Sequence, residues 1–277
     1  MNNFWKRTIT GILIVAIIAG SIILTQYAFA IVALIIVILG IYEFFLLYHN
    51  VQAKPMIIPG ILAGVYVYLS IALSTFGFIP FQGKIILLAI NLTVFPFLFF
   101  FELFSGNKNP IANVAFTILP ILYVSVPFGL LNLLYTGPSS LQFGFPTLLL
   151  GYFIIIWTND TGAYLAGMAF GKHKLFERVS PKKTWEGLIS GAVFAFLFAW
   201  LLSLIFTNHS LIDWFSVAAI VAVFGTMGDL VESLFKRNAQ VKDSGSILPG
   251  HGGMLDRFDV VFLSAPFLIL YFLLSTF

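Results

Sequence analysis

The residues best suited to chemistry lie in the second half of a chain of 277 residues. Between 225 and 237, five polar side chains recur at spacings of three and four, which places them on one face of a helix. The preceding turns are as apolar as a membrane helix, so the carboxylate of Asp229 should lie below the lipid headgroups. A ligand for a hard cation is favoured there over an ordinary solvated face. The five residues are Asp229, Glu232, Ser233, Lys236 and Arg237.

A glycine-rich loop follows at 242–259. Glycines around His251 allow a tight, exposed backbone whose N–H groups can approach phosphate oxygens. Asp256 and Asp259 would share one face of the next helix, and carboxylates near a phosphate suit Mg²⁺. His251 fits a hydrogen-bonding loop residue better than a nucleophile, and proton transfer by it is the alternative. The glycines expected to bind phosphate are Gly250, Gly252 and Gly253.

Cations also gather in the loop at 171–187. Two of them stand beside two hydroxyls at an expected helix start, an arrangement that could clamp a phosphate or polyphosphate. Lys172, Lys174 and Arg178 could equally attract anionic headgroups without specificity. Glu186 fits a capping carboxylate in the first helical turn better than a reacting group. The residues of the clamp are Ser180, Lys182, Lys183 and Thr184.

One further carboxylate, Asp160, lies beside Asn159 inside an otherwise apolar segment. A carboxylate within a membrane is costly, so it usually faces a cavity and has a partner. A functional role, a structural cap and an ion pair to a neighbouring helix all remain open for Asp160.

Several other catalytic motifs are absent from the sequence. It has no Gly-x-x-x-x-Gly-Lys-Ser/Thr loop, no zinc motif and no serine nucleophile elbow. It also has no cysteine, which excludes a disulfide framework and a thiolate nucleophile. Carboxylates, cations and a glycine-rich loop remain. That combination fits metal-assisted phosphoryl or nucleotidyl transfer, where positioning and charge neutralisation do most of the catalysis.

The elements that position these groups must be membrane helices. The chain is 60% hydrophobic and only 9% charged, with a mean hydropathy of +1.03. Such a surface must be solvated largely by lipid. Apolar windows of about 20 residues predict an all-α integral membrane protein, a polytopic bundle of about nine transmembrane helices, the first of them a retained span. The windows are 8–25, 28–48, 57–75, 85–104, 114–135, 147–169, 187–206, 215–235 and 260–277.

Charge placement predicts the orientation of these spans. With nine crossings, only Lys84 of the 14 Lys and Arg residues falls on the side opposite the N-terminus. This bias places the N-terminus and the polar loops of the second half in the cytoplasm. We therefore expect a multi-pass protein of the cell membrane with its active site facing the cytoplasm.

The two halves of the chain differ in polar content. We expect residues 1–140 to form lipid-facing scaffold helices with possible dimer contacts, and residues 141–277 to form the catalytic region. The first half carries Glu43 and Glu102 near cytoplasmic ends of its spans. Snorkelling or pairing at the interface is at least as good an explanation for them as function.

The segment 233–259, SLFKRNAQVKDSGSILPGHGGMLDRFD, resembles the signature of the phosphatidate cytidylyltransferases, or CDP-diacylglycerol synthases. The shared pattern is Ser, then Lys-Arg, Lys-Asp, His-Gly-Gly and Asp-Arg-x-Asp at fixed spacings, and every position is filled. The run at 160–172 and Ser-Pro-Lys-Lys-Thr at 180–184 are also similar to the family. The first five spans carry no matching motif.

This resemblance implies transfer of CMP from CTP to phosphatidic acid, giving CDP-diacylglycerol and pyrophosphate. It also implies Mg²⁺, in some members K⁺, nine spans, surrounding membrane lipids and a homodimer. No nucleic-acid partner is expected. The resemblance implies that Asp229 and Asp256 hold a pair of metal ions. We further expect Asp160, Asp243 and Asp259 to be supporting or additional ligands. The groups expected to act on the phosphates or in catalysis are Lys182, Lys183, Lys236, Arg237, Lys242, Asp243, His251 and Arg257.

Two other functions are compatible with a polytopic membrane protein. A CTP-dependent kinase of a polyprenol or diacylglycerol would share the substrate class and the metal. In that reaction the γ-phosphorus would be attacked, and CDP would be released in place of pyrophosphate. A transporter would need charged groups accessible from both sides, whereas the non-cytoplasmic side offers only Lys84, His209 and Asp213. A clear internal repeat is also lacking, which disfavours an inverted-repeat transporter.

Overall fold

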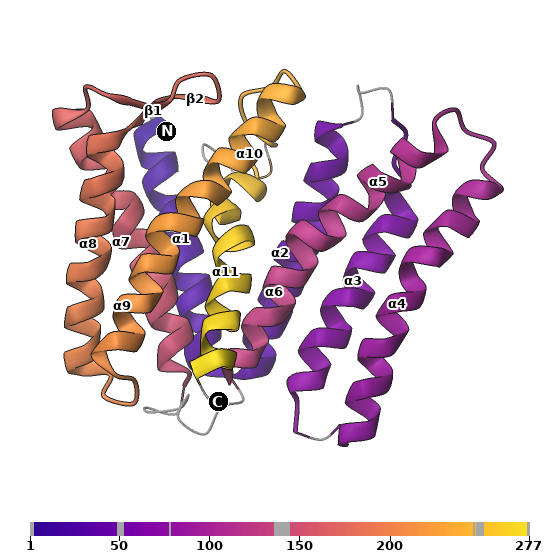
Figure 1. Ribbon diagram of the computed structural model, residues 1–277, viewed down its shortest axis with the longest axis horizontal. Helices are drawn as coiled ribbons and strands as arrows, with labels where there is room; N and C mark the ends of the chain where they lie inside the picture. Colours follow the sequence, from indigo (N-terminus) through magenta and orange to yellow (C-terminus); the bar gives the residue numbers. More distant parts are fainter. Residues whose placement is uncertain are drawn as a thin grey trace.

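The protein forms a bundle of long helices with one small hairpin at an end of the bundle (Figure 1). The computed structural model describes residues 3–48, 53–77, 79–135, 145–245, 247 and 252–275, with side chains from residue 8 onward. The α-helices are α1 (Asn3–Leu24), α2 (Gln26–Leu47), α3 (Ile57–Thr75), α4 (Phe81–Leu103), α5 (Pro110–Pro120), α6 (Val126–Leu131), α7 (Thr147–Phe170), α8 (Trp185–Ile205), α9 (Leu211–Ile220), α10 (Thr226–Asn238) and α11 (Leu255–Ser275). The remaining elements are the π-helical turns η1 (Ile121–Ser125) and η3 (Val221–Gly225), the 3-10 turn η2 (Asn132–Tyr135), and the strands β1 (Lys174–Phe176) and β2 (Ser180–Thr184).

Helices occupy every one of the predicted windows, which confirms the all-α polytopic membrane fold. Within the described part of the chain, seven helical stretches are long and apolar enough to cross a membrane. α1, with a shorter apolar stretch at Thr8–Leu24, and α7 fill the other two windows. The count of nine crossings stays a prediction. The seven stretches are Gln26–Leu47, Ile57–Thr75, Phe81–Leu103, Pro110–Tyr135, Trp185–Ile205, Leu211–Asn238 and Leu255–Ser275.

Two of these stretches contain a π-helical turn. In the first, η1 follows Pro120, which lacks the N–H that a regular helix would use. In the second, η3 separates α9 from α10 without any proline. Such turns are often found at functional sites, and η3 leads directly into the helix that carries Asp229.

The hairpin β1–β2 corrects one sequence-based expectation. Ser180 was expected at a helix start, but 180–184 form a strand paired antiparallel with β1, and α8 begins at Trp185. Thr184 is its N-cap and accepts a hydrogen bond from the N–H of Gly187 at 3.2 Å. Glu186 lies in the first turn as expected, where it accepts from the N–H of His173 at 3.2 Å and so ties the chain before β1 to α8.

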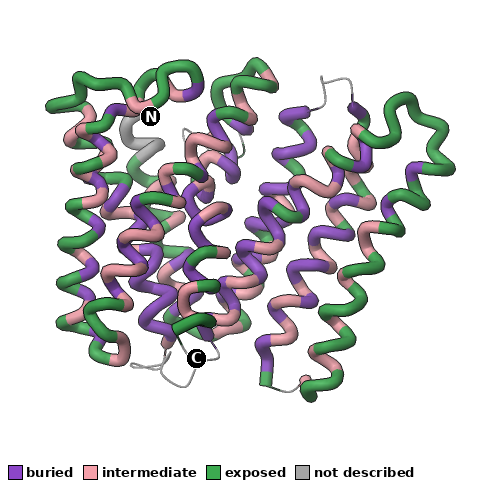
Figure 2. Tube along the Cα trace, viewed as in Figure 1, coloured by how far each residue is buried: buried purple, intermediate pink, exposed green. Residues whose placement is uncertain are grey.

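α11 lies inside the bundle and packs against α10, η3 and α6, whereas α4 forms one outer edge (Figure 1). Figure 2 shows the contrast: only Leu98 and Glu102 are buried in α4, whose residues are all described, while α11 has many buried positions. Phe128 of α6 packs edge-on against Phe258 and at a steep angle against Phe262 of α11. One hydrophobic core therefore crosses the predicted division near residue 140, and the division itself stays a prediction.

Candidate metal and phosphate site

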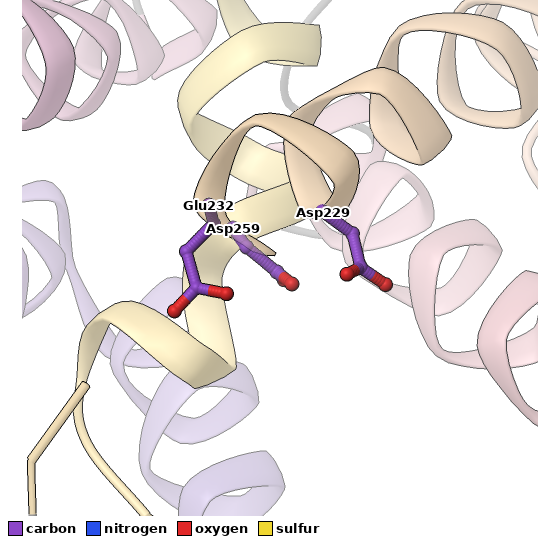
Figure 3. A group of neighbouring side chains, drawn as sticks. All are labelled: Asp229, Glu232 and Asp259. Carbon is purple, nitrogen blue, oxygen red and sulfur yellow. The ribbon is translucent and has the colours of Figure 1, made fainter. Parts of the chain in front are cut away.

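Three carboxylates from two helices meet near the end of the bundle that carries the hairpin. Asp229 and Glu232 lie on α10, and Asp259 lies on the second turn of α11. One oxygen of each lies within 4.8 Å of the others, and Figure 3 shows Asp259 in projection between the two α10 side chains. A Cβ at Gly228 would collide with the backbone carbonyl of Asp259, so a glycine is needed for this close approach of α10 to α11.

Glu232 is the most buried member of this acidic cluster, with 1% of its surface exposed. Lys236, one turn further along α10, forms an ion pair with Oε2 of Glu232, while Oε1 has no hydrogen-bond partner. A buried carboxylate oxygen without a donor, beside two more carboxylates, is unfavourable unless a cation or proton compensates it. Carboxylate oxygens are ligands that hard cations such as Mg²⁺ prefer. The acidic cluster could therefore hold a metal ion.

Asp256, which the sequence predicts to bind metal together with Asp229, accepts four hydrogen bonds from other residues of the protein. Its Oδ1 accepts from Nζ of Lys236 at 2.6 Å. Its Oδ2 accepts from the N–H of Gly253 at 2.8 Å and from the N–H and hydroxyl of Ser244, each at 2.9 Å. Asp256 thus fastens the glycine-rich loop to the first turn of α11. Its role as a metal ligand stays a prediction.

Lys236 joins α10 to α11. It forms ion pairs with both Glu232 and Asp256, and only 12% of its side chain is exposed. Its ammonium group therefore compensates two carboxylates that would otherwise be buried together. Contact of Lys236 with a phosphate stays a prediction.

Asp160 on α7 supplies a fourth carboxylate to the same region. It interacts electrostatically with Asp229, Lys183 and Arg257, so α7 faces the acidic cluster. Unlike the buried Asn159 beside it, Asp160 has an exposed side chain, and the Asn159 amide donates to its Oδ1 at 3.4 Å. The structure thus brings Asp160 near the predicted metal site.

The hairpin reaches the acidic cluster through one lysine. Lys183 forms an ion pair with Asp229, which places one cation of the predicted clamp at the carboxylates. Arg237, at the end of α10, donates from Nε to the carbonyl of Val179 at 3.3 Å. Arg237 therefore holds the hairpin against α10, and its contact with a phosphate stays a prediction.

The remaining predicted residues lie around this centre. Lys182, Lys242, Asp243 and Arg257 are exposed, and Ser180 is half-buried. Gly252 has a φ of 78°, a left-handed conformation that favours glycine, and the neighbouring Gly253 is buried. Gly250 and His251 lie outside the described residues.

Two residues of the site were missed from the sequence. The spacing puts Glu232 on the polar face of its helix, but nothing in the sequence distinguishes it as a ligand, whereas the structure places it in the acidic cluster. Tyr123 of η1 packs against Phe235 and Phe262, and its buried hydroxyl, which has no hydrogen-bond partner, interacts electrostatically with the acidic cluster. A tyrosine in an apolar span carries no local signal, because its proximity to α10 and α11 is a property of the fold.

The fold and the site define a polytopic membrane protein with clustered carboxylates and cations at one end of its bundle. Residues 5–275 match the family model described as the Cytidylyltransferase family, and the chain belongs to that family. This result confirms the family resemblance of 233–259 and the predicted enzyme class, a nucleotidyltransferase.

Individual relatives carry a more specific name. A protein of Bacillus subtilis (strain 168) named phosphatidate cytidylyltransferase is 33% identical over 278 residues, covering 100% of both chains. Proteins of the same name from Staphylococcus aureus (strain COL) and Staphylococcus saprophyticus are 42% and 39% identical over 170 residues. In these two matches the chain spans 62% of the relatives' length.

Proposed function

We propose that this protein is a phosphatidate cytidylyltransferase, which transfers CMP from CTP to phosphatidic acid at the cytoplasmic membrane face. The observation that carries the proposal is the acidic cluster of Asp229, Glu232 and Asp259 with Lys183 paired to it. The reaction brings together two negatively charged substrates, CTP and phosphatidic acid. The acidic cluster could bind a metal cation, and Lys183 supplies a second positive charge. The name of the full-length Bacillus subtilis relative supports the same substrates.

The reaction proposed is a displacement at phosphorus. An oxygen of the phosphatidic acid phosphomonoester attacks the α-phosphorus of CTP and forms a new P–O bond. The bond from that phosphorus to the oxygen leading to the β-phosphorus breaks, and pyrophosphate leaves. The attacking phosphate is already an anion near neutral pH, so little help from a general base is needed.

The carboxylates fit a resident divalent cation. Asp229, Glu232 and Asp259 would hold Mg²⁺, which when bound would screen the negative charges of the two substrates from each other. The unpartnered Oε1 of Glu232 supports this assignment. Asp256 and Asp160 are kept as further ligands, with K⁺ as a candidate second cation.

The chain's own cations would orient the substrates. Lys183 is well placed to bind a phosphate, because its ammonium group already pairs with Asp229. It could donate a hydrogen bond to a phosphate oxygen that binds beside the acidic cluster. The exposed Arg257 and Lys242 would contact the departing pyrophosphate. Lys236 would remain between Glu232 and Asp256 and keep their charges compensated. The predicted homodimer is not needed for any of these contacts.

The test separates cytidylyl transfer from the kinase alternative. Purified protein in detergent receives phosphatidic acid or, in parallel reactions, diacylglycerol or a polyprenol, with Mg²⁺ and CTP labelled on either the α- or the γ-phosphate. The proposal predicts label in the lipid from α-labelled CTP only, with release of pyrophosphate. Label in the lipid from γ-labelled CTP, with release of CDP, would instead establish a lipid kinase.

A further inference from the structure

Glu43, near the end of α2, is fully buried and contacts residues of the second half of the chain. Its Oε2 accepts a hydrogen bond from the N–H of Leu255 at 2.9 Å and lies 3.4 Å from the hydroxyl of Ser244. Leu255 is the first residue of α11, where backbone N–H groups have no partner within the helix. A carboxylate at this position satisfies such a donor and interacts favourably with the helix dipole. Glu43 therefore caps α11 from another helix.

Two described glycines of the glycine-rich loop, one on each side of its undescribed middle, also lie against the Glu43 carboxylate. A Cβ at Gly245 would lie 2.6 Å from Oε1 of Glu43, and a Cβ at Gly253 would lie 2.8 Å from its Cδ. Any side chain at these two positions would displace the carboxylate or the loop. Gly245 and Gly253 are therefore required for packing, independently of any phosphate binding, because only glycine leaves room for the Glu43 carboxylate at these positions.

Glu43 is connected to the site through Asp256. The hydroxyl of Ser244 stands between the two carboxylates, 2.9 Å from Asp256 and 3.4 Å from Glu43. Asp256 and Leu255 are neighbours in the first turn of α11, and Asp259 of the acidic cluster lies one turn later. A shift of this turn would therefore move Asp256 and Asp259 together.

Glu102 provides a natural comparison within the same half of the chain. It is also a buried carboxylate near the end of a span, with 4% of its surface exposed. Its partner is the amide of Asn113, 2.6 Å away, and Asn113 in turn accepts from the N–H of Lys54. These contacts connect α4, α5 and the chain before α3, and none of them involves the glycine-rich loop or α11.

We infer that Glu43 is a positioning residue for the reaction: it caps α11 and holds Ser244, Gly245 and Gly253 at the two described ends of the glycine-rich loop, and thereby sets the places of Asp256 and Asp259. The inference rests on the proposed function for its effect on turnover, but its effect on the loop can be measured without substrates. It assigns part of the catalytic geometry to the first half of the chain.

The experiment compares Glu43→Leu and Glu43→Gln with Glu102→Leu in purified detergent-solubilised protein. Leucine removes the acceptor at similar volume, and glutamine keeps one oxygen that can accept from Leu255. Amide hydrogen exchange over 241–256 and the kcat and KM for CTP are measured for each variant. Misplacing reacting groups by about 1 Å can cost about 100-fold in rate.

For Glu43→Leu we expect exchange in 241–256 at least tenfold faster and a loss of about 100-fold in kcat, with KM changed much less. Glu43→Gln should recover part of both, and Glu102→Leu should leave both at wild-type values. If Glu43→Leu does not fold, Glu43→Gln provides the test: the inference predicts faster exchange and a lower kcat in this variant than in the wild type. Wild-type exchange and kcat in a folded Glu43 variant, or equal losses in Glu102→Leu, would overturn the inference. An inactive wild type would count against the proposed function alone, since the exchange measurement would still test Glu43.

Discussion

The aspartates of the site differ in how exposed they are and in how many protein donors they have. The Asp229 side chain is 31% exposed and shares an ion pair with Lys183. The Asp256 side chain is 7% exposed and has donors on both oxygens. Substitutions at these two aspartates should therefore have different consequences for stability, even though both residues were predicted as metal ligands.

Asp256→Asn should reduce both activity and stability. The amide would keep some hydrogen bonds, but the charge that compensates the buried Lys236 would be lost. Breaking a buried ion pair costs about 3 kcal/mol or more. We expect a lower unfolding temperature than for Asp229→Asn, measured in the same detergent by differential scanning fluorimetry. Equal unfolding temperatures for the two variants would show that Asp256 does not fasten the loop.

Lys183→Met should weaken the use of CTP without unfolding the protein. The substitution keeps an apolar stem of similar length and removes the ammonium group beside Asp229. We expect kcat/KM for CTP to fall about 10-fold or more, because a hydrogen bond to a charged group contributes about 1.5–3 kcal/mol. The matched control is Lys174→Met, on the exposed face of β1 in the same hairpin. A comparable loss in Lys174→Met would point to a general surface-charge effect instead.

At the scale of elements, the site depends on how closely α10 approaches α11. Gly228 allows this approach, since a Cβ there would also lie 3.2 Å from the carbonyl carbon of Asp259. η3 leads the chain into α10, and Arg237 holds the hairpin against the end of that helix. The acidic cluster is therefore the product of helix packing rather than of one local motif.

Gly228→Ala should separate α10 from α11 and disturb the acidic cluster. We expect a loss of about 10-fold or more in kcat, because the shift is of the order that misaligns reacting groups. Gly20→Ala is the control: a Cβ at Gly20 meets nothing within 4 Å, and alanine favours the helix by up to about 1 kcal/mol. Wild-type activity in Gly228→Ala would mean that the neighbouring helices adjust without moving the carboxylates.

The sequence predicted the helices of this protein better than it predicted their contacts. Apolar windows are a local property, and they located the long helices. The spacing of Asp229, Glu232 and Lys236 is also local, and it predicted that these side chains share one helix face. The hairpin was missed because Ser-Pro-Lys-Lys-Thr has no strand pattern of its own and gains its partner from β1. Glu43 could not be assigned, because its contact with Leu255 joins residues 212 positions apart.

For the whole molecule, Figure 1 shows the hairpin, the first described residues and the end of α10 at one end of the bundle, and the end of α3 and the start of α4 at the other. The described part of the chain also ends, at α11, opposite the hairpin. Only Lys84 among the 14 Lys and Arg residues lies on the side predicted to be non-cytoplasmic. The positive-inside rule therefore predicts that the acidic cluster faces the cytoplasm.

This orientation can be tested cleanly because the chain has no cysteine. Asn107→Cys, in the exposed turn after α4, and Gln82→Cys, at the exposed start of α4, would place one thiol on each predicted side. With a membrane-impermeant maleimide on intact cells, we expect labelling of Gln82→Cys only, and of Asn107→Cys after permeabilisation. The reverse pattern would invert the topology and remove the site from the cytoplasm.

The central claim is that the carboxylates brought together by α10 and α11 hold the divalent cation on which transfer depends. The most direct measurement is Mn²⁺ binding, followed by electron paramagnetic resonance, to the wild type, Asp229→Asn and Glu102→Gln. We predict saturable binding that weakens about 10-fold or more in Asp229→Asn, by loss of a charged ligand, and is unchanged in Glu102→Gln. Mn²⁺ binding of wild-type strength in Asp229→Asn would contradict the claim.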